Sequence, residues 1–262
     1  MKNILLIGDS CVDEYQYGIV ERQSPEAPVS VLKLTRMESK PGMAANVKEN
    51  LLALDCEVDF VTNLDPIVKT RFIDERSGYH LLRVDKDDQA LPWSGKLFFE
   101  VDKYDAIVIS DYCKGFVTYE HIEMLRKSFN GPIFLDTKKQ DLARFHNIYV
   151  KINELEYKNR VSINDKLIVT KGAKGAMYKT NRDPKYETHF EAPKVEVHDV
   201  CGAGDTFLAA LACGFLEHNN VIDAIKYAIK AASITVQHNG VYAPTEEEIY
   251  ENFGNRSQRL HW

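Results

Sequence analysis

The sequence predicts an α/β fold in which a mostly parallel sheet is covered by helices on both faces, and three observations indicate it. Short apolar runs at 4–7, 106–109, 133–135 and 167–169 each end at a small or polar residue, as strands buried on both faces of a parallel sheet do. Amphipathic stretches lie between these runs, and such alternation is typical of layered α/β domains. The length of 262 residues fits a single domain of this class, so we expect one domain over 1–262.

Three helices are predicted from the spacing of apolar residues. The first covers 44–54, where Ala44, Val47 and Leu51 recur at helical spacing. The second covers 118–129 and shows the same periodicity. The third, 207–216, is apolar throughout, which favours a helix buried in the core.

Some β-like segments fall outside this alternation: 29–34, 68–73 and 79–84. A strand expected at 58–62 lies too close to the segment at 68–73 for a parallel crossover, which needs about a dozen residues or more. The last two segments fit a hairpin instead, with Gly78 able to take a positive φ. We therefore expect a small antiparallel flap beside the main sheet, built from about 14–36 and 66–86.

Composition argues against several classes of function. Lys and Arg total 33 against 39 Asp and Glu, a net charge of −6, so the chain lacks the broad basic surface of a nucleic-acid-binding protein. The longest apolar run, 207–216, is shorter than a membrane span, and the N-terminal apolar run is too short for a signal peptide. The 5 cysteines are scattered and form no CxxC pair, which argues against a disulfide framework or a zinc site. We expect a cytoplasmic protein with no nucleic acid or membrane partner.

A glycine-rich turn before the third helix is the most informative motif. Gly202 and Gly204 flank Ala203, and Asp205 follows at the start of the helix. The glycines leave backbone N–H groups unobstructed and the helix dipole adds positive potential, so the turn can bind an anion. A carboxylate at Asp205 suits a base that takes the proton of a hydroxyl attacking a phosphoryl group. A capped helix start without a ligand is the alternative.

The chain resembles the ribokinase-like (PfkB) family of carbohydrate kinases at four places, which occur in the family's order. Residues 199–206 resemble its C-terminal signature and 41–46 its N-terminal signature. Residues 153–156 resemble its NxxE element, and 171–175 stand where its nucleotide loop follows a strand. The resemblance implies a three-layer α/β/α sandwich with the flap as a lid. It also implies ATP and Mg²⁺ as cofactors and a sugar or sugar phosphate as acceptor.

The resemblance assigns a role to each matching position. Asp205 would be the catalytic base and Gly202, Ala203 and Gly204 the anion hole. The expected substrate-binding residues are Asp13, Gly42, Asn46, Arg71, Lys114 and Lys138. The expected nucleotide-binding residues are Asn153, Glu156, Lys171 and Gly172, with Glu156 acting indirectly on the metal. The alternatives are turn and helix-cap roles for the polar residues and a solvated surface for the lysines and the arginine.

Within the family, 8–29, 110–115 and 136–138 are similar to bacterial D-glycero-β-D-manno-heptose 7-phosphate kinases, which phosphorylate the anomeric hydroxyl of a heptose phosphate for lipopolysaccharide precursors. The chain departs from this pattern after Thr62, where the family has a further helix and strand. Met43 and Cys201 also replace the branch's usual Gly and Thr. A kinase of another small sugar, such as ribose or fructose, and a non-catalytic nucleotide- or sugar-binding regulatory homologue are the alternatives. The flap is expected to join a homodimer.

Overall fold

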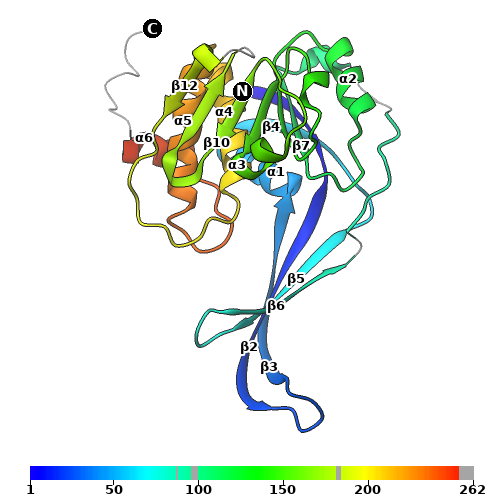
Figure 1. The fold of residues 1–262 in the computed structure, drawn as a ribbon, viewed down its shortest axis with the longest axis vertical. Coiled ribbons are helices and arrows are strands. Elements are labelled where there is room, and N and C mark those ends of the chain that lie inside the picture. The colour runs from blue at the N-terminus through cyan, green and yellow to red at the C-terminus, as the bar shows by residue number, and fades with distance from the viewer. Residues whose placement is uncertain (87, 96–99, 181–183, 254–262) are drawn as a thin grey trace.

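An eight-stranded sheet forms the centre of the larger body of the molecule (Figure 1). The computed structural model describes residues 1–86, 88–95, 100–180 and 184–253. The strand order is β12-β11-β10-β9-β8-β7-β1-β4, and the pairings from β10 to β4 are parallel. Strands β11 and β12 extend one edge in antiparallel fashion. The strands are β1 (Lys2–Gly8), β4 (Cys56–Thr62), β7 (Ala106–Asp111), β8 (Ile133–Thr137), β9 (Tyr149–Asn153), β10 (Leu167–Thr170), β11 (Ala176–Lys179) and β12 (Glu187–Phe190). The predicted α/β architecture is confirmed.

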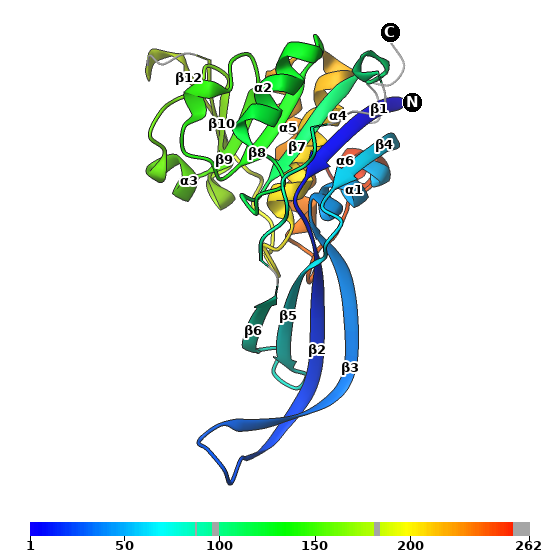
Figure 2. The ribbon, with the colours of Figure 1, turned by 90° about the vertical axis from the view of Figure 1, so that its right-hand side faces the viewer.

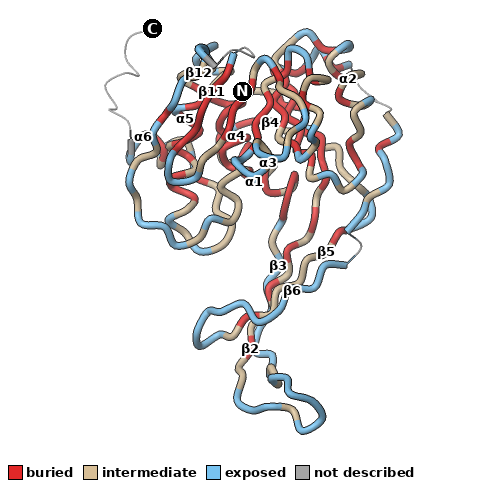
Figure 3. Tube along the Cα trace, viewed as in Figure 1, coloured by how far each residue is buried: buried red, intermediate tan, exposed pale blue. Residues whose placement is uncertain are grey.

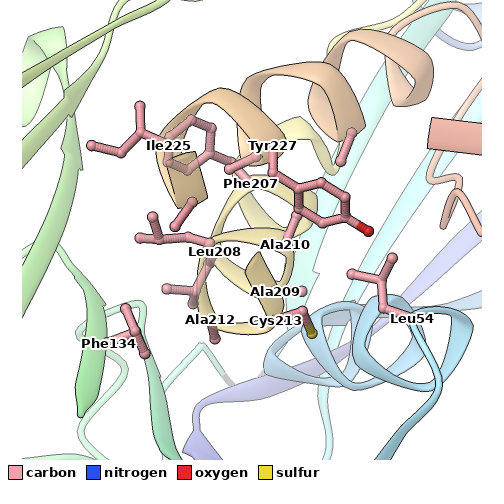
Figure 4. Packing of buried hydrophobic residues seen from close by; sticks show 14 of the residues in the cluster. Leu54, Phe134, Phe207, Leu208, Ala209, Ala210, Ala212, Cys213, Ile225 and Tyr227 are labelled. Carbon is pink, nitrogen blue, oxygen red and sulfur yellow. The ribbon is translucent and has the colours of Figure 1, made fainter. Parts of the chain in front are cut away.

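Helices cover both faces of this sheet and enclose two separate cores. The helices are α1 (Ala44–Ala53), α2 (Tyr119–Ser128), α3 (Glu154–Asn159), α4 (Ala203–His218), α5 (Val221–Thr235) and α6 (Glu246–Phe253), and the 3₁₀ turns are η1 (Val101–Lys103), η2 (Leu142–Arg144), η3 (Gly172–Lys174) and η4 (Pro184–Tyr186). One core packs α1, α4 and α5 against the sheet, with α4 in the middle (Figure 4). The other packs α2 against the opposite face through Ile122 and Leu125. Because α4 is covered on several sides, it is apolar almost all round, as its sequence predicts.

A second sheet of four strands projects from the body and forms the lid (Figures 1 and 2). Its strands are β2 (Ser10–Gln23), β3 (Ser30–Met43), β5 (Ile67–Asp74) and β6 (His80–Lys86), in the order β3-β2-β5-β6. The antiparallel arrangement expected for the flap holds for β2 with β3 and for β5 with β6, but β2 and β5 are parallel. The reason is topological, because β2 continues from β1 and β5 follows β4, two neighbouring parallel strands of the main sheet.

The lid joins the body through tight connections. The link from β4 to β5 is anchored by Asn63, whose side-chain oxygen accepts a hydrogen bond from the Ser10 backbone N–H at 2.7 Å. Strand β3 runs into α1 at Met43, whose φ of 56° is a backbone conformation that favours glycine. Buried residues concentrate in the body and near the base of the lid, while the far end of the lid is exposed (Figure 3). No helix among the described residues is long and apolar enough to cross a membrane.

Candidate active site

The glycine-rich turn forms the N-terminus of α4 and lies against the start of α1. Gly202 adopts a φ of +79° at the N-cap, so a side chain there would be strained. A Cβ at this position would also stand 2.9 Å from the Asn46 side-chain nitrogen, so the turn and α1 are in close contact. The first turn of α4 therefore presents the backbone of Ala203 and Gly204 at a helix N-terminus, the place where backbone N–H groups bind anions.

Asp205 is buried in the first turn of α4 and is held by two donors from other elements. The Asn46 side chain donates to Oδ2 at 2.8 Å, and the Tyr112 hydroxyl donates to Oδ1 at 2.7 Å. Burial raises the pKa of Asp205 to about 6, although both hydrogen bonds lower it. Its side chain is thus ionised at neutral pH while remaining a better proton acceptor than an exposed aspartate, which is the property required of a general base.

Tyr112 is positioned by a carboxylate at the end of β1. Both oxygens of Asp9 accept backbone N–H groups of the loop after β7: Oδ2 from Tyr112 at 2.8 Å and Lys114 at 3.2 Å, and Oδ1 from Phe116 at 3.1 Å. Burial raises the pKa of Asp9, against the effect of these hydrogen bonds. Tyr112 lies within the stretch 110–115, but its contact with Asp205 could not be predicted from the sequence, because the two residues are far apart in the chain.

Cationic residues gather on one face of the lid. The strand register pairs Asp13 with Lys40 on β3 and with Lys69 on β5, and it pairs Tyr15 with Arg71, so these side chains share a face. Arg71 forms an ion pair with Asp13 at 2.5 Å. Neither Lys40 nor Lys69 forms an ion pair within the part of the chain that the structure describes. Lys40 and Lys69 were not predicted. Lys69 lies two residues before Arg71 on β5, and this spacing, which places both side chains on one face of a strand, was a signal in the sequence.

The other expected substrate-binding residues take different positions. Gly42 lies against Asp13, because a Cβ there would stand 2.2 Å from the Asp13 Oδ2 atom. Lys114 forms an ion pair with Asp88 at 2.5 Å, which satisfies part of its charge. The Lys138 ammonium lies 4.7 Å from the centre of the Tyr112 ring, next to the hydroxyl-bearing side chain that contacts the base.

At the end of β9, Asn153 and Glu156 form the capping box of α3. The Asn153 side-chain oxygen accepts from the Glu156 N–H at 2.9 Å, and Glu156 Oε2 accepts from the Asn153 N–H at 2.7 Å. Burial raises the pKa of Glu156. Lys171 and Gly172 lie in the turn after β10, where Gly172 has a φ of +55°. Asn153 and Glu156 thus cap a helix, which was the alternative to a binding role. The contact of these residues with a nucleotide stays a prediction.

A magnesium ion that arrives with nucleotide phosphates fits these residues. No cluster of three or more His, Cys, Asp or Glu suited to a metal occurs among the described residues. Mg²⁺ bound to nucleotide uses the phosphates and water, with one or two protein carboxylates, so a dedicated cluster is not required. Glu156 uses Oε2 in the capping box, and the structure records no hydrogen bond to its Oε1 from the described residues.

Lys151 is a residue that the sequence analysis missed entirely. It lies on β9 with only 4% of its surface exposed, and its ammonium forms an ion pair with Asp136 at 2.6 Å. A Cβ placed on Gly204 would stand 3.1 Å from the Lys151 nitrogen. The lysine therefore reaches across from the sheet to the glycine-rich turn. Its position just before the NxxE element was the only signal available in the sequence.

Comparisons with known proteins agree with this geometry. Residues 150–248 match the pfkB family of carbohydrate kinases. The chain is 34% identical to the bifunctional protein HldE of Hyphomonas neptunium over an alignment 310 positions long, gaps included, which covers 95% of this chain and 63% of that protein. The chain thus spans less than two thirds of the length of this relative.

Solved structures show the same fold at low sequence identity. The ribokinase of Thermotoga maritima superposes with a TM-score of 0.73 at 18% identity, covering 96% of this chain and 99% of that one. The Arabidopsis thaliana ribokinase complexed with ribose and ATP gives 0.71 at 15% identity, covering 96% and 98%. The glycine-rich turn with its buried aspartate, the lid and these matches agree with one another: residues 150–248 match the pfkB family of carbohydrate kinases, and the described fold is that of the two ribokinases.

Proposed function

We propose that the chain transfers the γ-phosphoryl group of ATP to a hydroxyl of a sugar phosphate, with the anomeric hydroxyl of a heptose 7-phosphate or a similar sugar as the acceptor. The observation that carries the proposal is the buried Asp205 carboxylate, with a pKa raised to about 6, at the N-terminus of α4. A base next to an anion-binding turn is the arrangement that phosphoryl transfer to a hydroxyl requires.

Each part of the turn has a separate task in this reaction. Asp205 accepts the proton of the acceptor hydroxyl, while Asn46 and Tyr112 fix the orientation of its two oxygens. The backbone of Ala203 and Gly204 stabilises negative charge on the transferred group. Asn153 and Glu156 would lie beside the nucleotide phosphates, and Glu156 would act on Mg²⁺ indirectly, through water. Mg²⁺, when bound, would neutralise charge on the phosphates.

The charge on the lid supports a phosphorylated acceptor. A sugar phosphate brings a dianion, which needs cationic partners, and Lys40, Lys69 and Arg71 share the lid face that carries Asp13. Arg71 and Lys114 were both expected in this role from the sequence, and each forms an ion pair, with Asp13 and Asp88 respectively. Lys40 and Lys69 form no ion pair among the described residues, so they are the more available lid cations. The name of the bifunctional HldE relative does not state a substrate, so the heptose assignment rests on the sequence resemblance at 8–29, 110–115 and 136–138.

The proposal also covers the location of the protein and its oligomeric state. We expect a cytoplasmic enzyme that works as a homodimer, with its lid paired to the lid of a second copy, because several large apolar side chains of the lid are exposed. These are Val29, Leu34, Met37, Tyr79, Leu81, Leu82 and Val84. A kinase of an unphosphorylated pentose or hexose is the second candidate. The link from β4 to β5 is short, and the section that the resemblance places there, near the sugar pocket, is missing, which leaves the identity of the sugar open.

A substrate panel tests the proposal. We would measure kcat/KM from ADP release with heptose 7-phosphate, free heptose, fructose 6-phosphate and ribose at saturating Mg-ATP. A charge-assisted contact to phosphate contributes about 1.5–3 kcal/mol, so removing the phosphate from the preferred sugar should lower kcat/KM by about 10- to 150-fold. A best substrate that carries no phosphate would contradict the proposal.

Lid variants locate the phosphate. Lys69→Ala should lower kcat/KM for the phosphorylated sugar and leave the value for the free sugar nearly unchanged. Arg76→Ala is the matched control, because Arg76 is an exposed lid cation that pairs with Glu21 near the end of the lid. Equal effects of the two variants would show that the lid face does not bind the phosphate.

A further inference from the structure

Lys151 is a buried cation placed between the sheet and the anion-binding turn. It projects from β9 toward α4, since its neighbour Val150 packs in the core on the opposite face of the sheet. Its nitrogen lies 3.1 Å from the position that a Cβ on Gly204 would occupy. The absence of a side chain at Gly204 therefore leaves the ammonium in direct reach of the backbone at the turn.

The described residues around Lys151 favour its charged form but accept only one of its three N–H donors. Burial is the largest single effect and lowers its pKa, but Asp136, together with the charges of Asp205 and Glu156, raises it, so that the net shift is upward. An ammonium carries three N–H donors. The structure records one acceptor for them among the described residues, Asp136 Oδ2 at 2.6 Å.

A buried ion pair of this kind is a poor device for stability alone. Removing two charges from water costs several kcal/mol per ion, and replacing such a pair by apolar residues is often neutral or stabilising. A fixed cation beside an anion-binding turn has a clear use, however, because negative charge spreads over the oxygens of a phosphoryl group in transfer.

We propose that Lys151 is a catalytic residue that donates a hydrogen bond to the phosphoryl group in transfer, next to Gly204, and that Asp136 holds its ammonium in place. This inference rests on the proposed function and assigns a residue to it. The lysine adds a formal positive charge to an anion hole that otherwise consists of backbone N–H groups and a helix dipole.

The chain offers a matched control for a purely structural role. Lys179 on β11 is buried to the same degree, with 3% of its surface exposed, and its ammonium pairs with Glu187 at 2.7 Å. It lies in the antiparallel pair at the edge of the sheet. A double variant that replaces each ion pair by apolar residues leaves no unpaired buried charge, so Lys151→Met/Asp136→Leu can be compared directly with Lys179→Met/Glu187→Leu.

The first measurement does not depend on the sugar. Calorimetric titration with AMP-PNP and with ADP, both with Mg²⁺, gives the affinity ratio that reports contacts to the γ-phosphoryl group. The Lys151 double variant should lower this ratio by about 10-fold or more, while the Lys179 double variant should keep it within about twofold. An unchanged ratio in the Lys151 double variant would overturn the inference.

The second measurement uses turnover on the best sugar of the panel. The Lys151 double variant should lower kcat by about 100-fold or more with little change in the KM of the sugar, as expected when a donor to the transition state is lost. Lys151→Arg should restore part of kcat because it keeps the charge. Equal kcat losses in the two double variants would contradict the inference. An inactive wild-type protein on every sugar would contradict the proposed function instead, and the nucleotide ratio would still decide on Lys151.

Discussion

We expect Tyr112 to set the pH range in which Asp205 works as the proposed base, and Tyr112→Phe tests this directly. The substitution removes the hydroxyl that donates to Asp205 at 2.7 Å and leaves the ring and the second donor, Asn46, in place. The hydrogen bond stabilises the ionised carboxylate, so its loss raises the pKa of Asp205 above about 6. Activity should therefore require a higher pH in the variant.

The size of the effect follows from the strength of the bond. A hydrogen bond to a charged group contributes about 1.5–3 kcal/mol, and about 1.4 kcal/mol corresponds to one pKa unit, so the pKa of Asp205 should rise by about one to two units. At pH 7 the ionised fraction then falls from about nine tenths to between about one half and one tenth. The expected loss in kcat at pH 7 is about two- to tenfold, with recovery toward the wild-type rate near pH 9.

The assay is kcat as a function of pH from 5 to 9.5, measured by coupled ADP release on the best sugar. Tyr104→Phe is the matched control, because the Tyr104 hydroxyl donates to a different carboxylate, Asp59, at the edge of the sheet. Its pH profile should coincide with that of the wild type. A Tyr112→Phe profile whose acidic limb has not moved would refute the reasoning, since the hydrogen bond would then have no influence on the ionisation that limits the rate.

The remaining predictions concern the base and the lid. Asp205→Asn should lower kcat by about 100-fold or more while the affinity for nucleotide, measured by calorimetry, stays close to that of the wild type; substantial residual turnover would exclude the base assignment. The same variant should be more stable than the wild type above pH 7. Burial raises the pKa of Asp205 from 3.8 to about 6, so the wild type loses stability as pH rises through that range, by up to about 3 kcal/mol. Thermal melts at pH 4 and pH 8 check this, and an equal difference at both values would contradict it. Leu82→Glu, on an exposed strand of the lid, should convert a homodimer to a monomer in sedimentation, whereas a wild type that sediments as a monomer at micromolar concentration would exclude the dimer.

The sequence allowed the body of the fold to be predicted because its strands are buried on both faces. A run such as 106–109 has no polar alternation, and every residue of β7 is buried. Strand β2 was not predicted because its two faces differ: Asp13 and Tyr15 are buried while their neighbours are only partly so, and charged residues interrupt the apolar pattern. The parallel pairing of β2 with β5 depends on the neighbouring positions of β1 and β4, which local sequence does not contain.

In the candidate site, too, some residues could be predicted from local sequence and others could not. Asp205 and its glycines form a local motif, so their positions could be predicted from spacing alone. Tyr112 and Lys151 reach the turn from separate strands or loops, and only the assembled sheet brings them to it. Lys114 was expected to be available for substrate, but its pairing with Asp88 involves a segment for which the sequence predicted no structure.

The manner in which the lid is attached has a consequence for how substrate preference can change. The lid consists of two segments that leave the body: β2 with β3, between β1 and α1, and β5 with β6, after β4. Both segments begin at the ends of neighbouring parallel strands, β1 and β4. Changes in the length or sequence of these segments need not alter the register of the main sheet or the turn that carries Asp205. We expect that the lids of other proteins with this fold could be exchanged as a pair of segments, joined at Asp9 and Ala44 and again at Thr62 and Lys86. Because Asn46 lies two residues beyond Ala44, such grafts would replace the acceptor-binding surface while retaining the donor to the base. On the proposed function, substrate preference and phosphoryl transfer would be carried by separate segments of one chain.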